Sequence, residues 1–212
     1  FLHANAFAHV TWAKGIDAKG RPIVLPGSNP SAGGTLVCPG AGGGTNWMSP
    51  SYNPHTGLLY VACREQCDKF YTSPQAYRQG HLYIGSSWET IPDGKDWGGL
   101  RAFDPLTGTL KWDFKYTSAP WGGAMSVAGG VVFAGDMEGN LIALDGRTGQ
   151  HLWHFQTGSA IIASPISYAV NGRQYVVIPS GSALFAFALP ETEPARSVQQ
   201  AAHTSIKASS GR

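Results

Sequence analysis

Charged side chains are scarce in this sequence. Asp, Glu, Lys and Arg make up only 13% of the 212 residues, and the formal net charge is +2 without any basic run. Nucleic acids and anionic membranes are bound through basic patches, so neither partner is indicated. No apolar run reaches about eighteen residues, which argues against a membrane-spanning helix.

Familiar catalytic and metal-binding motifs are also missing. The sequence contains no Gly-x-Ser-x-Gly and no Cys-x-x-Cys-His. Its seven His residues show no metal spacing. His151 and His154 are three apart, and in a strand they are expected to point to opposite faces. No two carboxylates stand out as a general acid and base, so the sequence offers no catalytic and no metal-ligating candidate.

The chain carries no initiator Met and no signal peptide, and it opens on Phe1 in a strand-like pattern. We therefore expect a fragment or a processed piece, with any export signal upstream. Three cysteines are an odd number. An exported protein would pair two of them and leave one, whereas a cytosolic protein would keep all three reduced.

Glycine and proline are abundant, with 28 and 14 residues, which favours short strands joined by turns over long helices. Residues 102–112 and 143–153 both read A-x-D-x-x-T-G-x-x-x-W and lie 41 residues apart. A period near 40 with a Trp and a Thr-Gly turn in each unit predicts β-propeller blades of about four strands. The predicted fold class is all-β.

The chemistry of its residues explains the repeated A-x-D-x-x-T-G-x-x-x-W motif. An Asp (Asp104 or Asp145) can hydrogen-bond the backbone ahead of it, and the Gly that follows accepts positive φ, so the two make a tight turn. The Trp can wedge between neighbouring sheets, with its N–H bonded to a carbonyl there. We therefore assign these residues to packing between blades. A degenerate copy is expected at residues 52–61, and its Gly57 precedes Gly108 by 51, which predicts an insertion of about ten residues.

We divide the chain into a partial propeller, residues 1–190, and a polar tail without periodicity, residues 191–212, which we expect to be disordered. Further strands are predicted at residues 1–12, 58–63, 81–84, 131–134, 161–168, 175–179 and 184–189. Turn-rich connections are expected at residues 14–30, 85–87, 92–94 and 138–140.

The least ordinary stretch is CPGAGGGTNW, residues 38–47. Four glycines in five positions require a sharp bend or a close approach to something else. A dinucleotide loop fits poorly because no strand is predicted before the run and no helix after it, and no Lys-Ser/Thr follows for a phosphate loop. The run either delivers Asn46 and Trp47 to a central cavity or forms a flexible surface loop.

The two repeats and three further stretches together resemble one known family. They are the two repeats, CPGAGGGTNWMSPSYNPHTGLLYV (38–61), PWGGAMSVAGGVVFAGDMEGNLIALD (120–145) and YVVIPSGSALFAFALP (175–190). They are similar to the C-terminal half of PQQ-dependent quinoprotein alcohol dehydrogenases of the methanol/ethanol type. The resemblance covers about residues 1–190 and implies about half of an eight-bladed propeller, with PQQ and a metal ion on the axis.

The resemblance also implies roles for particular residues. Asn46 matches the side chain that approaches the reactive carbonyl edge of PQQ, with Trp47 beside it, and Trp121 matches a residue near the PQQ carboxylates. The family's cysteine before the glycine run bridges to one about thirty residues later. Cys38 and Cys67, which are 29 apart, fit that pair better than Cys38 and Cys63, so a Cys38–Cys67 disulfide in an oxidising, periplasmic compartment is expected.

Other parts of the family's site are expected upstream of Phe1. These are the ligands of the calcium or lanthanide ion, the catalytic Asp, the vicinal-cysteine ring, the Trp beneath PQQ and the Arg beside its quinone. The implied activity is oxidation of primary alcohols to aldehydes, with this chain inactive unless joined by an N-terminal propeller half or by self-association. A separate cytochrome c is the expected electron acceptor.

One alternative is a non-catalytic scaffold built from the same repeats, which would bind protein partners such as outer-membrane assembly factors. A scaffold needs no glycine run reaching the axis and no Cys38/Cys67 spacing. Both features are present, so the sequence favours the enzyme lineage.

Overall fold

The computed structural model describes residues 1–91 and 96–190, which contain strands and no helix. In chain order the strands are β1 Ala13–Ile16, β2 Pro22–Val24, β3 Thr35–Val37, β4 Ser51–Asn53, β5 Leu58–Glu65, β6 Asp68–Thr72, β7 Ser86–Thr90, β8 Trp97–Phe103, β9 Leu110–Tyr116, β10 Ala124–Ser126, β11 Val131–Gly135, β12 Asn140–Asp145, β13 His151–Gln156, β14 Ile166–Val170, β15 Arg173–Ser180 and β16 Ala183–Phe187. The all-β class is as predicted. In this part of the chain nothing helical is long and apolar enough to cross a membrane.

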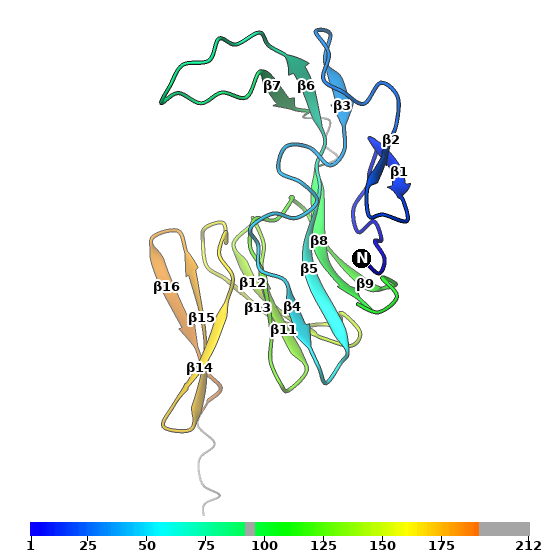
Figure 1. The fold of residues 1–212 in the computed structure, drawn as a ribbon. Helices are drawn as coiled ribbons and strands as arrows, with labels where there is room; N and C mark the ends of the chain where they lie inside the picture. The colour runs from blue at the N-terminus through cyan, green and yellow to red at the C-terminus, as the bar shows by residue number, and fades with distance from the viewer. Residues whose placement is uncertain (92–95, 191–212) are drawn as a thin grey trace, which may run out of the picture.

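Three antiparallel sheets follow one another along the chain and form successive blades (Figure 1). Blade A consists of β4-β5-β8-β9, blade B of β10-β11-β12-β13, and blade C of the three strands β14-β15-β16. The two predicted repeats lie at equivalent places, on the last two strands of blades A and B. The blade prediction is therefore confirmed.

Blades A and B are joined by a shared apolar core. Its buried members come from both sheets: Leu58, Tyr60, Leu100, Ala102, Trp112, Tyr116, Ala124, Val132, Ala134, Ile142 and Leu144. Each fully buried large apolar side chain stabilises the fold by about 1.5–3 kcal/mol. This core fixes the relative position of the blades, and so the position of every loop at their ends.

The tight turns have the expected chemistry. Asp145 Oδ1 accepts from the backbone N–H groups of Arg147 and Thr148 at 3.0 and 2.9 Å, and Gly149 has a φ of 73°. Asp104 accepts from Leu106 N–H at 2.9 Å in the same way. Hydrogen bonds within the turns hold the pKa of both carboxyls below the usual range, with Thr148 the main cause at Asp145.

The Trp of the first repeat seals the boundary between blades A and B. Trp112 is buried, and its Nε1–H donates to the Gly146 carbonyl in the turn of blade B at 3.0 Å. Tyr60 donates to the same carbonyl at 3.1 Å. The predicted inter-blade docking is confirmed for Trp112. Trp153, in the second repeat, faces blade C, stays 40% exposed and packs its edge on Phe187.

The degenerate copy at residues 52–61 is not a third repeat. Its turn has the same form, with Asn53 Oδ1 accepting from His55 N–H at 2.9 Å and Gly57 at a φ of 71°. However, it joins β4 to β5, the first hairpin of blade A, whereas the repeats join the last two strands of a blade. The 51-residue spacing from Gly57 to Gly108 is therefore the distance between two turns of one blade, not between two repeats.

An insertion does interrupt blade A, and it is larger than expected. Residues 66–96 separate β5 from β8, whereas residues 136–139 separate β11 from β12. Within the insertion, β6 pairs with β7 and also with β3, which precedes the insertion, and the three strands form a separate sheet at the top of Figure 1. The strand predicted at 81–84 is wrong, because the pairing partner of β6 is Ser86–Thr90, part of which was predicted as a turn. The turn predicted at 92–94 and the tail 191–212 lie outside the described residues.

Two predictions near the N-terminus are also wrong. Residues 1–12 form no strand, and the connection predicted at 14–30 contains the β1-β2 hairpin. The first residues are held instead by single contacts to blade A: the Phe7 carbonyl accepts from Arg101 Nη1 at 2.6 Å, and His9 N–H donates to Glu65 at 2.9 Å. The alternation of apolar residues in this segment suggested a strand, but the segment has no neighbouring strand to pair with among the described residues.

The prediction that His151 and His154 point to opposite faces of a strand is wrong. A β-bulge shifts the register of β13, with Ala143 opposite Trp153 but Leu144 opposite His151. The extra residue, Leu152, brings His151 and His154 to one side, and their facing ring nitrogens are 3.2 Å apart. The same bulge occurs at Lys111 in β9, so it is part of the repeat.

Candidate functional site

The glycine run is tied to the end of β5 along its whole length. Gly40 N–H donates to the Gln66 carbonyl at 2.8 Å, and Arg64 N–H donates to the Gly44 carbonyl at 2.8 Å. The Cys38–Cys67 disulfide, with a Cα–Cα distance of 4.4 Å, closes the same two segments. This is the pairing that the family resemblance implied, and Cys63 is free and buried. The flexible-loop alternative does not fit such a run.

Several positions in the run favour glycine, Gly42 and Gly43 among them. Gly43 has a φ of 71°, which favours a residue without Cβ. A Cβ at Gly42 would lie 3.2 Å from the Arg64 guanidinium and 3.3 Å from the Trp121 ring. The run therefore bends at Gly43 and packs closely at Gly42. No helix follows it, as predicted, but β3 precedes it, contrary to prediction.

The run brings the three predicted cofactor residues together. Trp47 and Trp121 stack with ring centroids 4.5 Å apart and planes 16° apart. Asn46 lies next to Trp47, and its amide donates to the Gly42 carbonyl at 3.3 Å. Trp47 is 67% exposed, so this pair presents an open indole face next to an exposed carboxamide. Such a surface suits a flat ligand with carbonyl oxygens.

A buried guanidinium lies behind this pair. The Cζ of Arg64 is 3.6 Å from the Trp121 ring centroid, and Arg64 is only 2% exposed. Trp47 and Arg64 both lie within 4.5 Å of the Trp121 centroid, so they occupy opposite faces of that ring. The three side chains form a column, with Arg64 innermost and Trp47 outermost.

The surroundings of Arg64 keep it charged. Burial lowers the pKa of the guanidinium from its usual value, while the charges of Asp68 and Asp96 act in the other direction. Arginine remains protonated under such shifts. Arg64 also donates to the Pro120 carbonyl at 2.8 Å and to the amide oxygen of Gln66. The site therefore contains one fixed positive charge beneath its aromatic wall.

These residues fit a planar anionic aromatic cofactor better than a metal ion. The column and Asn46 offer ring faces, N–H donors and a cation, but no carboxylate. Two polar atoms near the run, Thr45 Oγ1 and Arg64 Nε, are buried without a hydrogen-bond partner among the described residues. The grouping of possible metal ligands in the described part of the chain is His9, Cys38 and Cys67, whose two cysteines are bonded to each other.

Sequence reasoning missed Arg64. Its neighbours in β5 alternate as a buried strand, so it gave no signal beyond being a charged residue in an apolar run, LLYVACRE. That signal was usable, because a buried arginine requires compensating partners.

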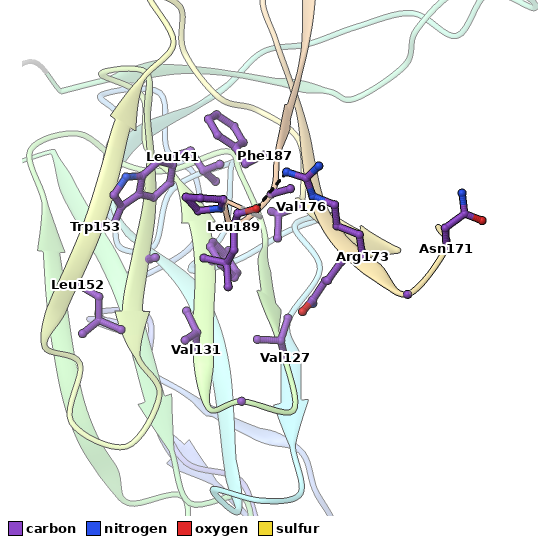
Figure 2. Close-up of a pocket in the computed structure, with 17 residues that line it drawn as sticks. Val127, Val131, Leu141, Leu152, Trp153, Asn171, Arg173, Val176, Phe187 and Leu189 are labelled. Atoms are coloured by element: carbon purple, nitrogen blue, oxygen red, sulfur yellow. Dashed lines mark hydrogen bonds between the residues drawn. The ribbon is translucent and has the colours of Figure 1, made fainter. Parts of the chain in front are cut away.

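A separate groove lies between blades B and C (Figure 2). It has a volume of about 1030 Å³ and is lined mainly by apolar side chains, including Val131, Trp153 and Phe187. At the corresponding boundary of blades A and B, Trp112 and Tyr60 close on Gly146. None of the predicted cofactor residues lines the groove, so it is not the candidate site.

Comparison with known proteins confirms the family resemblance. The family model described as the glucose/ethanol/alcohol dehydrogenase β-propeller domain matches residues 115–176. The quinoprotein alcohol dehydrogenase PedH of Pseudomonas putida is 38% identical over 180 residues, which are 81% of this chain and 30% of PedH. The 1-butanol dehydrogenase (cytochrome c) of Thauera butanivorans is 36% identical over 194 residues, 85% of this chain and 28% of that protein.

Solved structures give the same result. A europium-containing methanol dehydrogenase superposes with a TM-score of 0.79 at 30% identity, over 85% of this chain and 33% of that one. The chain spans about 30% of the length of the curated relatives it matches, which is less than the half expected from the sequence.

Proposed function

We propose, from its homology to quinoprotein alcohol dehydrogenases, that this chain forms one wall of the cofactor site in a PQQ- and metal-dependent alcohol dehydrogenase. Such an enzyme oxidises primary alcohols to aldehydes. The observation that carries the proposal is the Trp47–Trp121 stack at 4.5 Å, presented beside Asn46 by the glycine run. The chain alone is expected to bind the cofactor and to lack dehydrogenase activity.

The residues of this chain would bind and orient the cofactor. PQQ, when bound, supplies the acceptor for the hydride that leaves the alcohol. The exposed carboxamide of Asn46 is a hydrogen-bond donor for the carbonyl edge of a quinone. Trp47 and Trp121 supply flat apolar surface that excludes water from one side of the site. The guanidinium of Arg64 lies behind Trp121 and supports this surface from its inner face.

The remaining parts of the enzyme would come from elsewhere. Calcium or a lanthanide would be held by ligands on the remaining propeller blades, since the column and Asn46 offer no carboxylate. The name of the Thauera relative supports a cytochrome c as electron acceptor. The Cys38–Cys67 disulfide favours an oxidising compartment, and we assign the protein to the periplasm.

A titration of the purified chain with PQQ in the presence of Ca²⁺ tests the proposal, with the quenching of tryptophan fluorescence as readout. We expect saturable binding that weakens about tenfold in Asn46→Ala, because one hydrogen bond to the ligand is lost. Trp88→Leu is the matched control, since this half-exposed indole lies in β7, outside the site. It should leave the affinity unchanged.

Absence of binding to a chain with an intact β-sheet circular dichroism spectrum would contradict the proposal. In that case the homology would reflect ancestry alone. Equal weakening by Trp88→Leu and Asn46→Ala would show that PQQ adsorbs to exposed aromatic surface.

A further inference from the structure

We infer that Arg64 is a positioning residue that clamps Trp121 against Trp47, and so fixes the aromatic wall that faces the cofactor. This inference rests on the proposed function, because it assigns the ligand of the wall as a flat anionic quinone.

The clamp acts on Trp121 from two directions. The guanidinium Cζ lies over the ring, 3.6 Å from its centroid, where the ring quadrupole attracts a cation. Its Nη1 donates to the carbonyl of Pro120 at 2.8 Å, directly before Trp121 in the chain. Arg64 thus holds both the side chain and the backbone that carries it, and neither contact alone would fix the ring.

Further contacts hold Arg64 itself in place. Its Nη2 donates to Gln66, and the Gln66 amide donates to Asp96 Oδ2 at 3.0 Å. Gly42 packs against Arg64 and Trp121, and a Cβ there would lie 3.2 and 3.3 Å from them, closer than most Cβ contacts. Lysine cannot reproduce this geometry, because it lacks the planar fork that stacks and donates at the same time.

The ligand-free chain gives the first test. Stacked indoles couple their electronic transitions, so the Trp47–Trp121 pair should give an exciton couplet in circular dichroism. We expect Arg64→Met and Arg64→Lys to abolish the couplet. Lys115→Met is the control, since Lys115 lies over a different indole, the Trp97 ring, at 4.8 Å. A couplet that survives both Arg64 variants would overturn the inference.

Binding of PQQ gives the second test. Each Arg64 variant should raise the Kd for PQQ about tenfold in the wild-type background. In a Trp121→Leu background the same substitution should have no further effect, because Arg64 acts through the indole. Additive effects would show that Arg64 acts directly by its charge, and would overturn the positioning role.

Because the Arg64 variants could misfold, a variant that keeps the arginine provides an independent test of the clamp. Gly42→Ala places a methyl group against Arg64 and Trp121 and should reduce the couplet and the PQQ affinity together. If it changes neither, the close packing of the clamp is wrong. If the wild-type chain shows the couplet but binds no PQQ, the proposed function fails and the cofactor assignment with it, while the couplet measurement still decides the clamp.

Discussion

The indole N–H of Trp112 donates a 3.0 Å hydrogen bond to the backbone carbonyl of Gly146 across the boundary between two blades. The contact joins the Trp of the first repeat to the turn of the second. Each repeat therefore has a Trp that can donate a hydrogen bond and a turn whose carbonyl can accept one. Blade C has no corresponding turn among the described residues, and there Trp153 remains 40% exposed.

This difference predicts unequal effects of the same substitution. Trp112→Phe should lower the free energy of unfolding by about 2–3 kcal/mol, because it removes a buried hydrogen bond and leaves space in the core. Trp153→Phe should cost less than about 1 kcal/mol, since its indole is less buried. Guanidinium unfolding of both variants checks this, and equal losses would show that Trp112 is not the docking residue.

The acceptor half of the contact can be tested at Gly149. Its φ is 73°, and a Cβ there would lie 2.8 Å from the Trp112 ring. Gly158 has a similar φ of 85° with open space around it. Gly158→Ala should cost about 1 kcal/mol from backbone strain alone, and Gly149→Ala about 1–3 kcal/mol more from the added clash. Similar values for the two variants, measured by thermal or denaturant unfolding, would contradict the docking geometry.

Much of this architecture followed from local chemistry. An Asp or Asn followed by a left-handed Gly makes the same turn wherever it occurs, so the turns at Asp104, Asp145 and Asn53 were all recognisable. The same generality caused the error at Asn53, because a turn motif does not say which hairpin of a blade it closes. Strand pairing carries that information, and it depends on residues far apart in the chain.

The candidate site was likewise predictable from the sequence only in part. The glycine run and its neighbours Asn46 and Trp47 were visible because four close glycines have no ordinary packing role. Arg64 was not, because its role depends on Trp121, which lies far along the chain in the connection between blades A and B and reaches Arg64 only through the fold. The β-bulge at Leu152 was equally hidden, since it arises from register between strands.

The Cys38–Cys67 disulfide should contribute substantially to stability. Closing a loop with a sequence separation of 29 removes denatured-state entropy worth about 3.5 kcal/mol in the chain-entropy account. Reduction should therefore lower the free energy of unfolding by roughly that amount, and a Cys38→Ser, Cys67→Ser variant should match the reduced protein.

Counting reactive thiols checks the pairing independently. Burial raises the pKa of the Cys63 thiol to about 12, so Cys63 should not react with a thiol reagent in the native protein at neutral pH. One thiol should react after unfolding, and all three cysteines after unfolding with a reductant. A reactive thiol in the native state would contradict either the pairing or the burial.

The two repeat turns should make stability depend on acidity. Hydrogen bonds from Thr148 and the backbone lower the pKa of Asp145 in the folded protein, and backbone bonds do the same for Asp104. A carboxyl with a depressed folded pKa stabilises the protein above its unfolded pKa of about 4, and this contribution is lost as the pH falls through the folded value. Both side chains lie at the surface and are half-buried, so solvent screening keeps each effect small.

Asp145→Asn isolates this contribution, because the turn at Asn53 shows that an amide forms the same geometry without a charge. The variant should fold, be slightly less stable than wild type at pH 7, and lose less stability between about pH 5 and 3. Adding Asp104→Asn should flatten the curve further. Denaturant unfolding at each pH measures this, and parallel curves for the three proteins would show that the acid sensitivity resides in other carboxyls.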